Sequence, residues 1–188
     1  MSKFLIVCLG NIGSEYENTR HNIGFKVADE LAFAGQTQFV QDRLAFRCEV
    51  KVKGKLMIII KPTTYMNLSG KALNYWMQAE KINAENILVV TDDISLPFGS
   101  LRIKPKGSDG GHNGLKSIQE TLGNDIYARL RFGVGSSFAK GKQVEYVLGV
   151  WNAEEQQTLQ ERIKIAAEMI KSFCTIGLQL TMTQFNNK

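Results

Sequence analysis

The sequence has few histidines, cysteines and prolines, and its cysteines exclude two classes of protein. The 188 residues include two histidines, three cysteines and three prolines. Cys8, Cys48 and Cys174 are odd in number, far apart and in no CxxC pair, so they predict neither a disulfide framework nor a zinc site. We interpret each as a small buried apolar residue of a protein in a reducing compartment.

Long apolar runs are also lacking. The longest clean runs cover residues 4–9 and 56–60, and both are far short of a membrane span. The N-terminal run FLIVCL is too short for the apolar part of a signal peptide, and no small-residue cleavage site follows it. We therefore expect a cytoplasmic protein.

The remaining composition is typical of a folded domain. Apolar residues make up 44% of the chain and charged residues 22%. No repeat, low-complexity tract or linker divides the sequence, so we expect a single domain over residues 1–188. The net charge of +5 indicates an anionic partner only weakly, because many basic proteins bind no nucleic acid.

The apolar pattern predicts strands and helices that alternate along most of the chain. Helical spacing predicts helices at residues 23–34, 69–79, 114–122 and 153–174. Short β-rich runs predict strands at residues 4–10, 44–52, 56–60, 86–91, 101–104 and 129–135, the second and third of which form a hairpin. The alternation predicts an α/β fold in which helices flank both faces of a mixed, twisted sheet.

Polar segments follow four of the predicted strands. They are GNIG (10–13), TYMNLSG (64–70), TDDISLP (91–97) and GGHNG (110–114). Functional loops of open α/β sheets gather at the carboxyl ends of the strands. We therefore expect one crevice to collect six polar residues: Asn11, His21, Asn67, Asp92, His112 and Asn113.

A histidine beside a carboxylate and among asparagines suits general-base activation of water. The carboxylate fixes the imidazole tautomer, and asparagine amides hold a peptide backbone or an oxyanion without adding charge. Each residue alone has a simpler explanation, as a loop histidine, a turn-forming asparagine or a capping aspartate. The repetition of the pattern after successive strands favours a site.

Other motifs are weaker. GNIGSE departs from the GxGxxG loop of dinucleotide-binding proteins, and no HExxH or CxxC spacing indicates a metal, so we expect neither. Basic residues flank the GGHNG segment and would suit phosphates if they formed one rim, although ordinary solvated side chains explain them equally well. They are Arg102, Lys104, Lys106, Lys116, Arg129, Arg131, Lys140 and Lys142.

Six motifs in this order and spacing resemble the bacterial-type peptidyl-tRNA hydrolase family: GNIGSEY, TRHNIG, KPTTYMNLSG, DDISLPFG, GGHNGL and RLRFGVG. The resemblance covers nearly the whole chain. It implies a single α/β domain of the phosphorylase/hydrolase-like type, monomeric and without metal or cofactor. It also implies a reaction: hydrolysis of the ester between peptide and tRNA in peptidyl-tRNA released from the ribosome.

The resemblance assigns roles to individual residues. It implies that His21 is the catalytic base, that Asp92 is its partner carboxylate, and that Asn11, Asn67 and Asn113 hold the peptide and the reacting carbonyl. The same comparison implies that Met66 and His112 line the groove, that Tyr16 contacts substrate, and that Lys104 and Arg131 bind tRNA phosphates.

Three positions depart from the usual family pattern. They affect how Asp92 is positioned and how substrate is held, and not the class of reaction. Ile12 stands where proline is usual, Thr91 where histidine is usual, and Ser95 where aspartate is frequent.

Two alternative functions stay open at this point. One is an RNA-binding relative that has lost hydrolysis, and the other is a nucleotide-binding or phosphorylase-like enzyme on a similar sheet.

Overall fold

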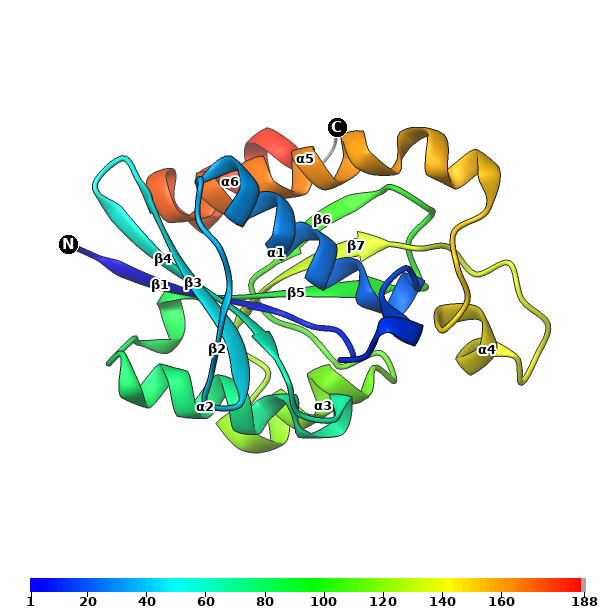
Figure 1. Cartoon of the computed structure of the whole chain (residues 1–188), viewed down its shortest axis with the longest axis horizontal. Helices are drawn as coiled ribbons and strands as arrows, with labels where there is room; N and C mark the ends of the chain where they lie inside the picture. Colours follow the sequence, from blue (N-terminus) through cyan, green and yellow to red (C-terminus); the bar gives the residue numbers. More distant parts are fainter. Residues whose placement is uncertain (187–188) are drawn as a thin grey trace.

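The strand β1 (Lys3–Cys8) lies at the centre of a seven-stranded mixed sheet (Figure 1). The computed structural model describes residues 1–186. The strand order is β2-β3-β4-β1-β5-β7-β6. The other strands are β2 (Val40–Asp42), β3 (Ala45–Val52), β4 (Lys55–Pro62), β5 (Ile87–Asp93), β6 (Leu101–Lys104) and β7 (Ala128–Gly133).

The four central strands run in the same direction. Strand β1 pairs in parallel with β4 on one side and β5 on the other, and β5 pairs in parallel with β7. The antiparallel pairs β2–β3, β3–β4 and β6–β7 lie toward the edges of the sheet. Parallel strands end at the same edge, so the segments after β1, β5 and β7 start close together.

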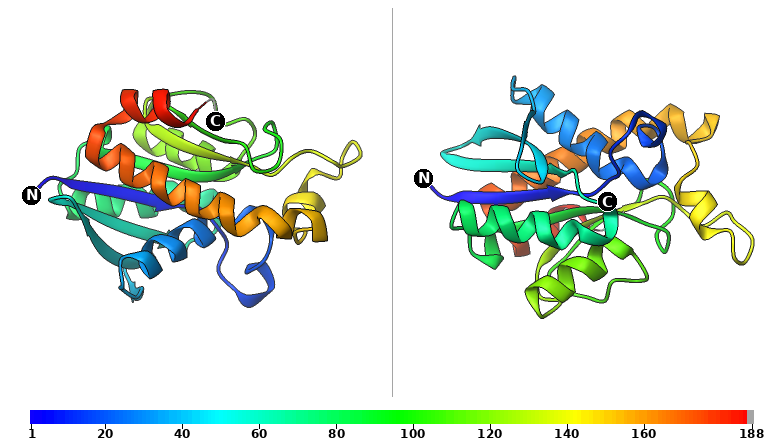
Figure 2. Two further views of the ribbon diagram at one scale, coloured as in Figure 1. Left: turned by 90° about the horizontal axis from the view of Figure 1, so that it is seen from above. Right: turned by 60° about the horizontal axis from the view of Figure 1, so that its bottom comes forward.

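Helices cover both faces of the sheet (Figures 1 and 2). One face carries α1 (Ile23–Ala34), α5 (Ala153–Ile176) and α6 (Leu178–Phe185), and the other carries α2 (Ser69–Ala79) and α3 (Asn113–Leu122). Side chains alternate along β1, so Ile6 and Cys8 join one apolar cluster and Leu5 and Val7 join the other. The predicted mixed sheet flanked by helices on both faces is confirmed.

The short helix α4 (Gln143–Val147) projects from the end of the molecule at which β1 and β5 finish (Figure 1). The sequence did not predict α4, α6 or β2. Helix α4 has five residues and no buried one, and β2 has three exposed residues, so neither has the apolar periodicity that marks a longer element.

The predicted strands and helices otherwise lie where expected, with one informative shift. The predicted hairpin of β3 and β4 is confirmed, and it turns at Lys53 and Gly54, both of which have positive φ. Strand β5 was predicted to end at residue 91 but continues to Asp93, because β7 pairs with its last two residues. Both aspartates are therefore held by a strand rather than by a loop.

The three cysteines are buried, as the sequence predicted. Burial raises the pKa of Cys48 to about 11 and that of Cys174 to about 12, so their thiols stay protonated at neutral pH. Across residues 1–186, no helix is both long enough and apolar enough to span a membrane.

Candidate active site

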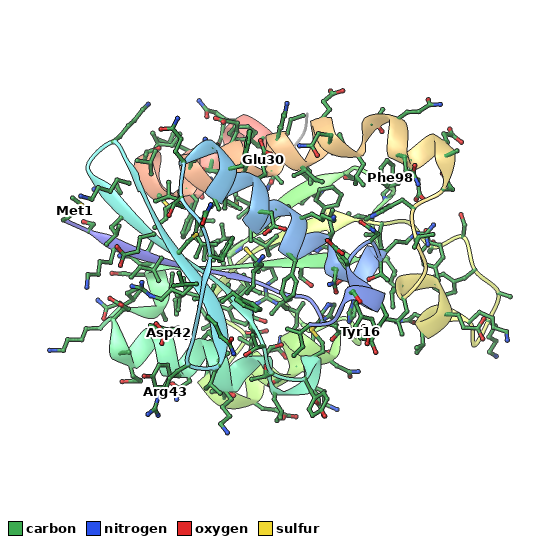
Figure 3. All side chains as sticks on the ribbon, viewed as in Figure 1. Met1, Tyr16, Glu30, Asp42, Arg43 and Phe98 are labelled. Atoms are coloured by element: carbon green, nitrogen blue, oxygen red, sulfur yellow. The ribbon has the colours of Figure 1, made fainter. Side chains whose placement is uncertain are left out.

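A cavity of about 460 Å³ opens where β1, β5 and β7 meet α3 and α4. Tyr16 marks this end of the molecule in Figure 3, on the same side as α4 and away from Met1. The lining contains most of the predicted site residues: Asn11, His21, Met66, Asp92, Lys104, His112, Asn113 and Arg131. Gln143, Val144, Val147 and Leu148 form a wall from α4 and the residue after it.

Asp92 holds both histidines of the protein. Its Oδ2 lies 2.9 Å from Nδ1 of His21, and its Oδ1 lies 2.8 Å from Nε2 of His112. The Asp92 side chain is 3% exposed, whereas those of His21 and His112 are 15% and 10% exposed. The two imidazole centroids are 5.0 Å apart. The carboxylate is thus buried beneath two rings that face the cavity.

The position of His112 fixes its tautomer. His112 is the N-cap of α3, and its Nδ1 accepts hydrogen bonds from the backbone N–H of Gly114 and Leu115. An accepting Nδ1 has no proton, so Nε2 carries the proton and donates it to Asp92. His112 is therefore a neutral donor that fixes one oxygen of the carboxylate.

The other oxygen of Asp92 orients His21. An ionised carboxylate only accepts, so Nδ1 of His21 carries the proton in this bond and Nε2 is left to accept. Burial lowers the pKa of His21, but the charge of Asp92 and the hydrogen bond to it outweigh burial and raise that pKa above its ordinary value. Burial alone would raise the pKa of Asp92, yet attraction to the two imidazoles and hydrogen bonds from them hold it well below its usual range.

The 3₁₀ turn Arg20–Asn22 presents His21 and also fixes Asn11. The side-chain Oδ1 of Asn22 accepts from the backbone N–H of Asn11, and its Nδ2 donates to the Asn11 carbonyl, both at 2.8 Å. The half-buried Asn11 lies three residues after the end of β1, so Asn22 couples the segment after that strand to the turn carrying His21.

Gly24 allows this turn to lie close to the sheet. A Cβ atom there would lie 2.4 Å from the backbone oxygen of Leu9 and 3.0 Å from that of Val90. Any larger residue would push the start of α1, and with it His21, away from the ends of β1 and β5. The glycine of the TRHNIG motif is thus explained by packing against backbone.

The glycine-rich segment before His112 is held by Arg129, one of the basic residues for which the sequence left open a phosphate-binding rim or ordinary solvated side chains. The solvated alternative is wrong for Arg129, because this residue is 2% exposed and its guanidinium lies 3.9 Å from the centre of the Tyr127 ring. It donates to the carbonyls of Gly107 and Asp125 at 2.9 and 2.8 Å. A buried cation therefore fixes the loop that leads to His112.

Arg131 lines the cavity but has protein partners of its own. Its Nε donates to Oδ2 of Asp93 at 2.6 Å, and one terminal nitrogen donates to Oγ of Ser95 at 3.1 Å. Ser95, one of the three residues that depart from the family pattern, thus contributes a neutral hydroxyl to the contacts of Arg131, and Asp93 contributes the carboxylate. Lys104 is exposed and also lines the cavity.

The other two residues that depart from the family pattern are Thr91 and Ile12. Thr91 is buried, and its hydroxyl donates to the carbonyl of Asp92 at 3.1 Å. Ile12 is 47% exposed and takes part in no apolar cluster among residues 1–186.

Two predicted site residues lie outside the cavity lining. Asn67 is exposed beside the buried Met66, and Tyr16 is half-buried in the loop before the His21 turn. The carbonyl of Tyr16 accepts from the hydroxyl of Thr19, so its backbone stabilises the turn. Their predicted contacts with substrate stay predictions.

A metal could be considered at the two histidines and Asp92, because one donor atom from each lies within 4.8 Å of the others. The geometry favours hydrogen bonding. Each oxygen of Asp92 already accepts from one imidazole, and the nitrogens that approach it carry protons.

Sequence reasoning missed three residues that hold the site together: Arg20, Asn22 and Arg129. Arg20 and Asn22 flank His21 in the TRHN motif, and polar neighbours on both sides of a candidate base were the signal that could have found them. No comparable signal marks Arg129, because only the tertiary structure shows that it is buried.

An α/β sheet with a buried aspartate orienting a histidine at its carboxyl edge suits a hydrolase that activates water by general-base catalysis. The peptidyl-tRNA hydrolase family profile matches residues 5–188. The chain is 55% identical to the peptidyl-tRNA hydrolase of Bacteroides fragilis, covering 99% of this chain and 100% of that protein, and 58% identical to that of Cytophaga hutchinsonii, covering 99% of each.

Solved structures give the same result. The crystal structure of peptidyl-tRNA hydrolase from Acinetobacter baumannii superimposes with a TM-score of 0.91 at 32% identity, covering 97% of this chain and 94% of that chain. The protein belongs to the peptidyl-tRNA hydrolase family.

Proposed function

We propose that the protein hydrolyses the ester bond between peptide and tRNA in peptidyl-tRNA released from the ribosome, and so recycles the tRNA. The observation that carries the proposal is the 2.9 Å contact between Nδ1 of His21 and Oδ2 of Asp92. It leaves Nε2 of His21 as the nitrogen that takes a proton from water. Membership of the family supports the identity of the substrate.

The reaction follows from this geometry. Nε2 of His21 removes a proton from water as the water oxygen attacks the ester carbonyl carbon. The tetrahedral intermediate then breaks its bond to the ribose oxygen, which takes the proton back from the imidazolium. Asp92 stabilises the imidazolium that forms between the two steps.

Asparagine amides provide the neutral contacts that this reaction needs. Asn11 and Asn113 line the cavity and are suited to hold the reacting carbonyl and the last peptide unit. Asn67 and Tyr16 lie beyond the cavity, and we infer that they contact the peptide or the tRNA end further from the ester. Lys104 and Arg131 are suited to tRNA phosphates.

The test is release of tRNA from N-acetyl-aminoacyl-tRNA by the wild type and by His21→Ala, with unblocked aminoacyl-tRNA as the control substrate. We expect the wild type to cleave the blocked substrate and the variant to lose about 100- to 10,000-fold in rate while still binding tRNA. A folded His21→Ala variant with the wild-type rate would contradict the role of His21.

A folded wild type that binds tRNA without cleaving it would instead favour the silent RNA-binding relative. That alternative is not favoured, because the histidine, the aspartate and the asparagines of the family pattern are all present, and most of them line one cavity.

We further infer that the protein acts in the cytoplasm as a monomer without a metal, and membership of the peptidyl-tRNA hydrolase family supports this inference. Enzyme treated with a chelator and then assayed in magnesium buffer, which tRNA requires, is expected to keep its full rate. A loss that added zinc or manganese restores would contradict this.

A further inference from the structure

Arg20, the residue before His21, is buried among groups from the opposite wall of the cavity. It is 8% exposed. One terminal nitrogen donates to Oε1 of Glu155 at 2.9 Å, and the other donates to the carbonyl of Tyr146 at 3.1 Å. Its guanidinium carbon lies 4.1 Å from the centre of the Tyr146 ring. A single side chain thus joins the histidine turn to α4 and to the start of α5.

The backbone reinforces this connection. The N–H of Arg20 donates to the carbonyl of Gly149 at 3.0 Å, and Thr19 and Val150 form an isolated β-bridge. A Cβ atom at Gly149 would lie 3.1 Å from the Arg20 guanidinium, so the two segments are in close contact. Gln143, Val144, Val147 and Leu148, the neighbours of Tyr146 in and just after α4, line the cavity that His21 faces.

Glu155 is itself fixed by the helix that carries it. It is the third residue of α5, and its Oε1 also accepts from the backbone N–H of Asn152 in a capping box. The side chains of Glu155 and Arg20 are each 9% exposed. Separating the two side chains would leave a buried charge without its partner, which is strongly destabilising. Arg20 and Glu155 are therefore held in this contact.

We propose that Arg20 is a positioning residue of the reaction, which holds His21 at the distance and angle that its contact with Asp92 requires. The inference rests on the proposed ester hydrolysis. The planar fork of the guanidinium grips Glu155 and the Tyr146 carbonyl at the same time, so the turn carrying His21 cannot rotate independently of α4 and α5. A displacement of about 1 Å at a reacting group lowers rates about 100-fold.

The test compares Arg20→Lys with a matched control, Arg47→Lys. Lysine keeps the charge but lacks the fork, so it cannot hold both partners. Arg47 is also a partly buried, ion-paired arginine, since one of its terminal nitrogens contacts Glu49 at 2.6 Å and Glu80 at 2.8 Å and its guanidinium lies 5.2 Å from the Trp76 ring, but it lies outside the cavity lining. Both variants are expected to lower the melting temperature.

Only Arg20→Lys is expected to lower kcat, by about 10- to 100-fold, with KM changed much less. A role in stability alone predicts equal effects of the two variants on kcat. A folded Arg20→Lys with the wild-type kcat would overturn the proposal. Wild type that does not cleave would instead overturn the proposed function, so the two failures are distinguishable.

A double-mutant cycle tests whether Arg20 acts through His21. In single-turnover assays at high enzyme concentration, Arg20→Lys is expected to cause no further loss in a His21→Ala background. The same fold-loss in both backgrounds would overturn the proposal. Should Arg20→Lys fail to fold, Glu155→Gln keeps the helix cap while removing the charge, and an unchanged kcat in that variant would overturn the proposal as well.

Discussion

At the scale of the residue, the hydrogen bonds to Asp92 fix which nitrogen of each histidine carries a proton. It accepts from Nδ1 of His21 and from Nε2 of His112, and the backbone of α3 prevents His112 from turning round. The two rings therefore have different roles although both contact one carboxylate. His21 has an accepting nitrogen to offer to water, whereas the accepting nitrogen of His112 is already occupied by the helix.

The pH dependence of the reaction follows from the raised pKa of His21. A general base works when it is deprotonated, so kcat/KM should rise with pH through an inflection above the ordinary histidine value of 6.5. Asp92→Asn removes the charge that raises this pKa and leaves burial, which lowers it. The inflection is then expected to move to lower pH, and the plateau to fall about 100- to 10,000-fold.

The measurement is the pH profile of kcat/KM for both proteins over the range in which they stay folded. An inflection that stays in place or moves upward in Asp92→Asn would contradict the assignment of His21 as the titrating base.

The sequence indicated most of these residues but not their contacts. His21, Asp92 and His112 were predicted to converge because each follows or flanks a strand end, and the carboxyl ends of parallel strands meet. The pairing of each histidine with one oxygen of Asp92 was not predictable, since it depends on β5 continuing to Asp93 and on His112 being a helix cap. Arg129 shows most clearly what the sequence alone does not predict, because its local sequence resembles that of an exposed basic residue although the side chain is buried.

At the scale of the element, the start of α1 is the part of the fold that most constrains the site. Gly24 brings it against the backbone of Leu9 and Val90, and Asn22 ties it to Asn11. Long elements such as α2 and α5 were predictable from apolar spacing alone. Short ones such as α4 were not, although α4 supplies one wall of the cavity.

Gly24→Ala tests this constraint. Alanine favours a helix over glycine by about 1 kcal/mol, so propensity alone predicts a more stable protein. The close backbone contacts predict the opposite, a loss of about 1–3 kcal/mol from overpacking together with a lower kcat as His21 moves. Urea denaturation and turnover should be measured together.

Asn74→Ala, at an exposed position of α2, is the matched control and should gain stability without a change in kcat. A gain in stability in Gly24→Ala would contradict the steric argument.

At the scale of the whole molecule, the basic residues near the cavity are of two kinds. Some are exposed lysines, and others are arginines whose guanidinium groups already bond to other parts of the protein. Arg129 holds a loop, and Arg131 is shared between Asp93, Ser95 and the cavity. Lys104 remains exposed beside them. The net charge of +5 therefore does not by itself show which cations are free to bind phosphate.

Arg131→Ala is expected to weaken tRNA binding and to reduce by about 1 the slope of log affinity against log salt concentration, as the loss of one phosphate contact predicts. Fluorescence anisotropy over a salt series measures both quantities. Lys164→Ala, at an exposed position of α5, should change neither. An unchanged slope in Arg131→Ala would show that Asp93 keeps the guanidinium from the tRNA.

The central place of β1 has a consequence for how the protein is made. This strand leaves the ribosome before the other strands of the sheet, but its partners on the two sides, β4 and β5, follow more than fifty and more than eighty residues later. At synthesis rates of about 5–20 residues per second, both edges of an apolar strand stay unpaired for several seconds. A chain released before β5 has been made keeps one edge of its central strand open, and so becomes a template for aggregation.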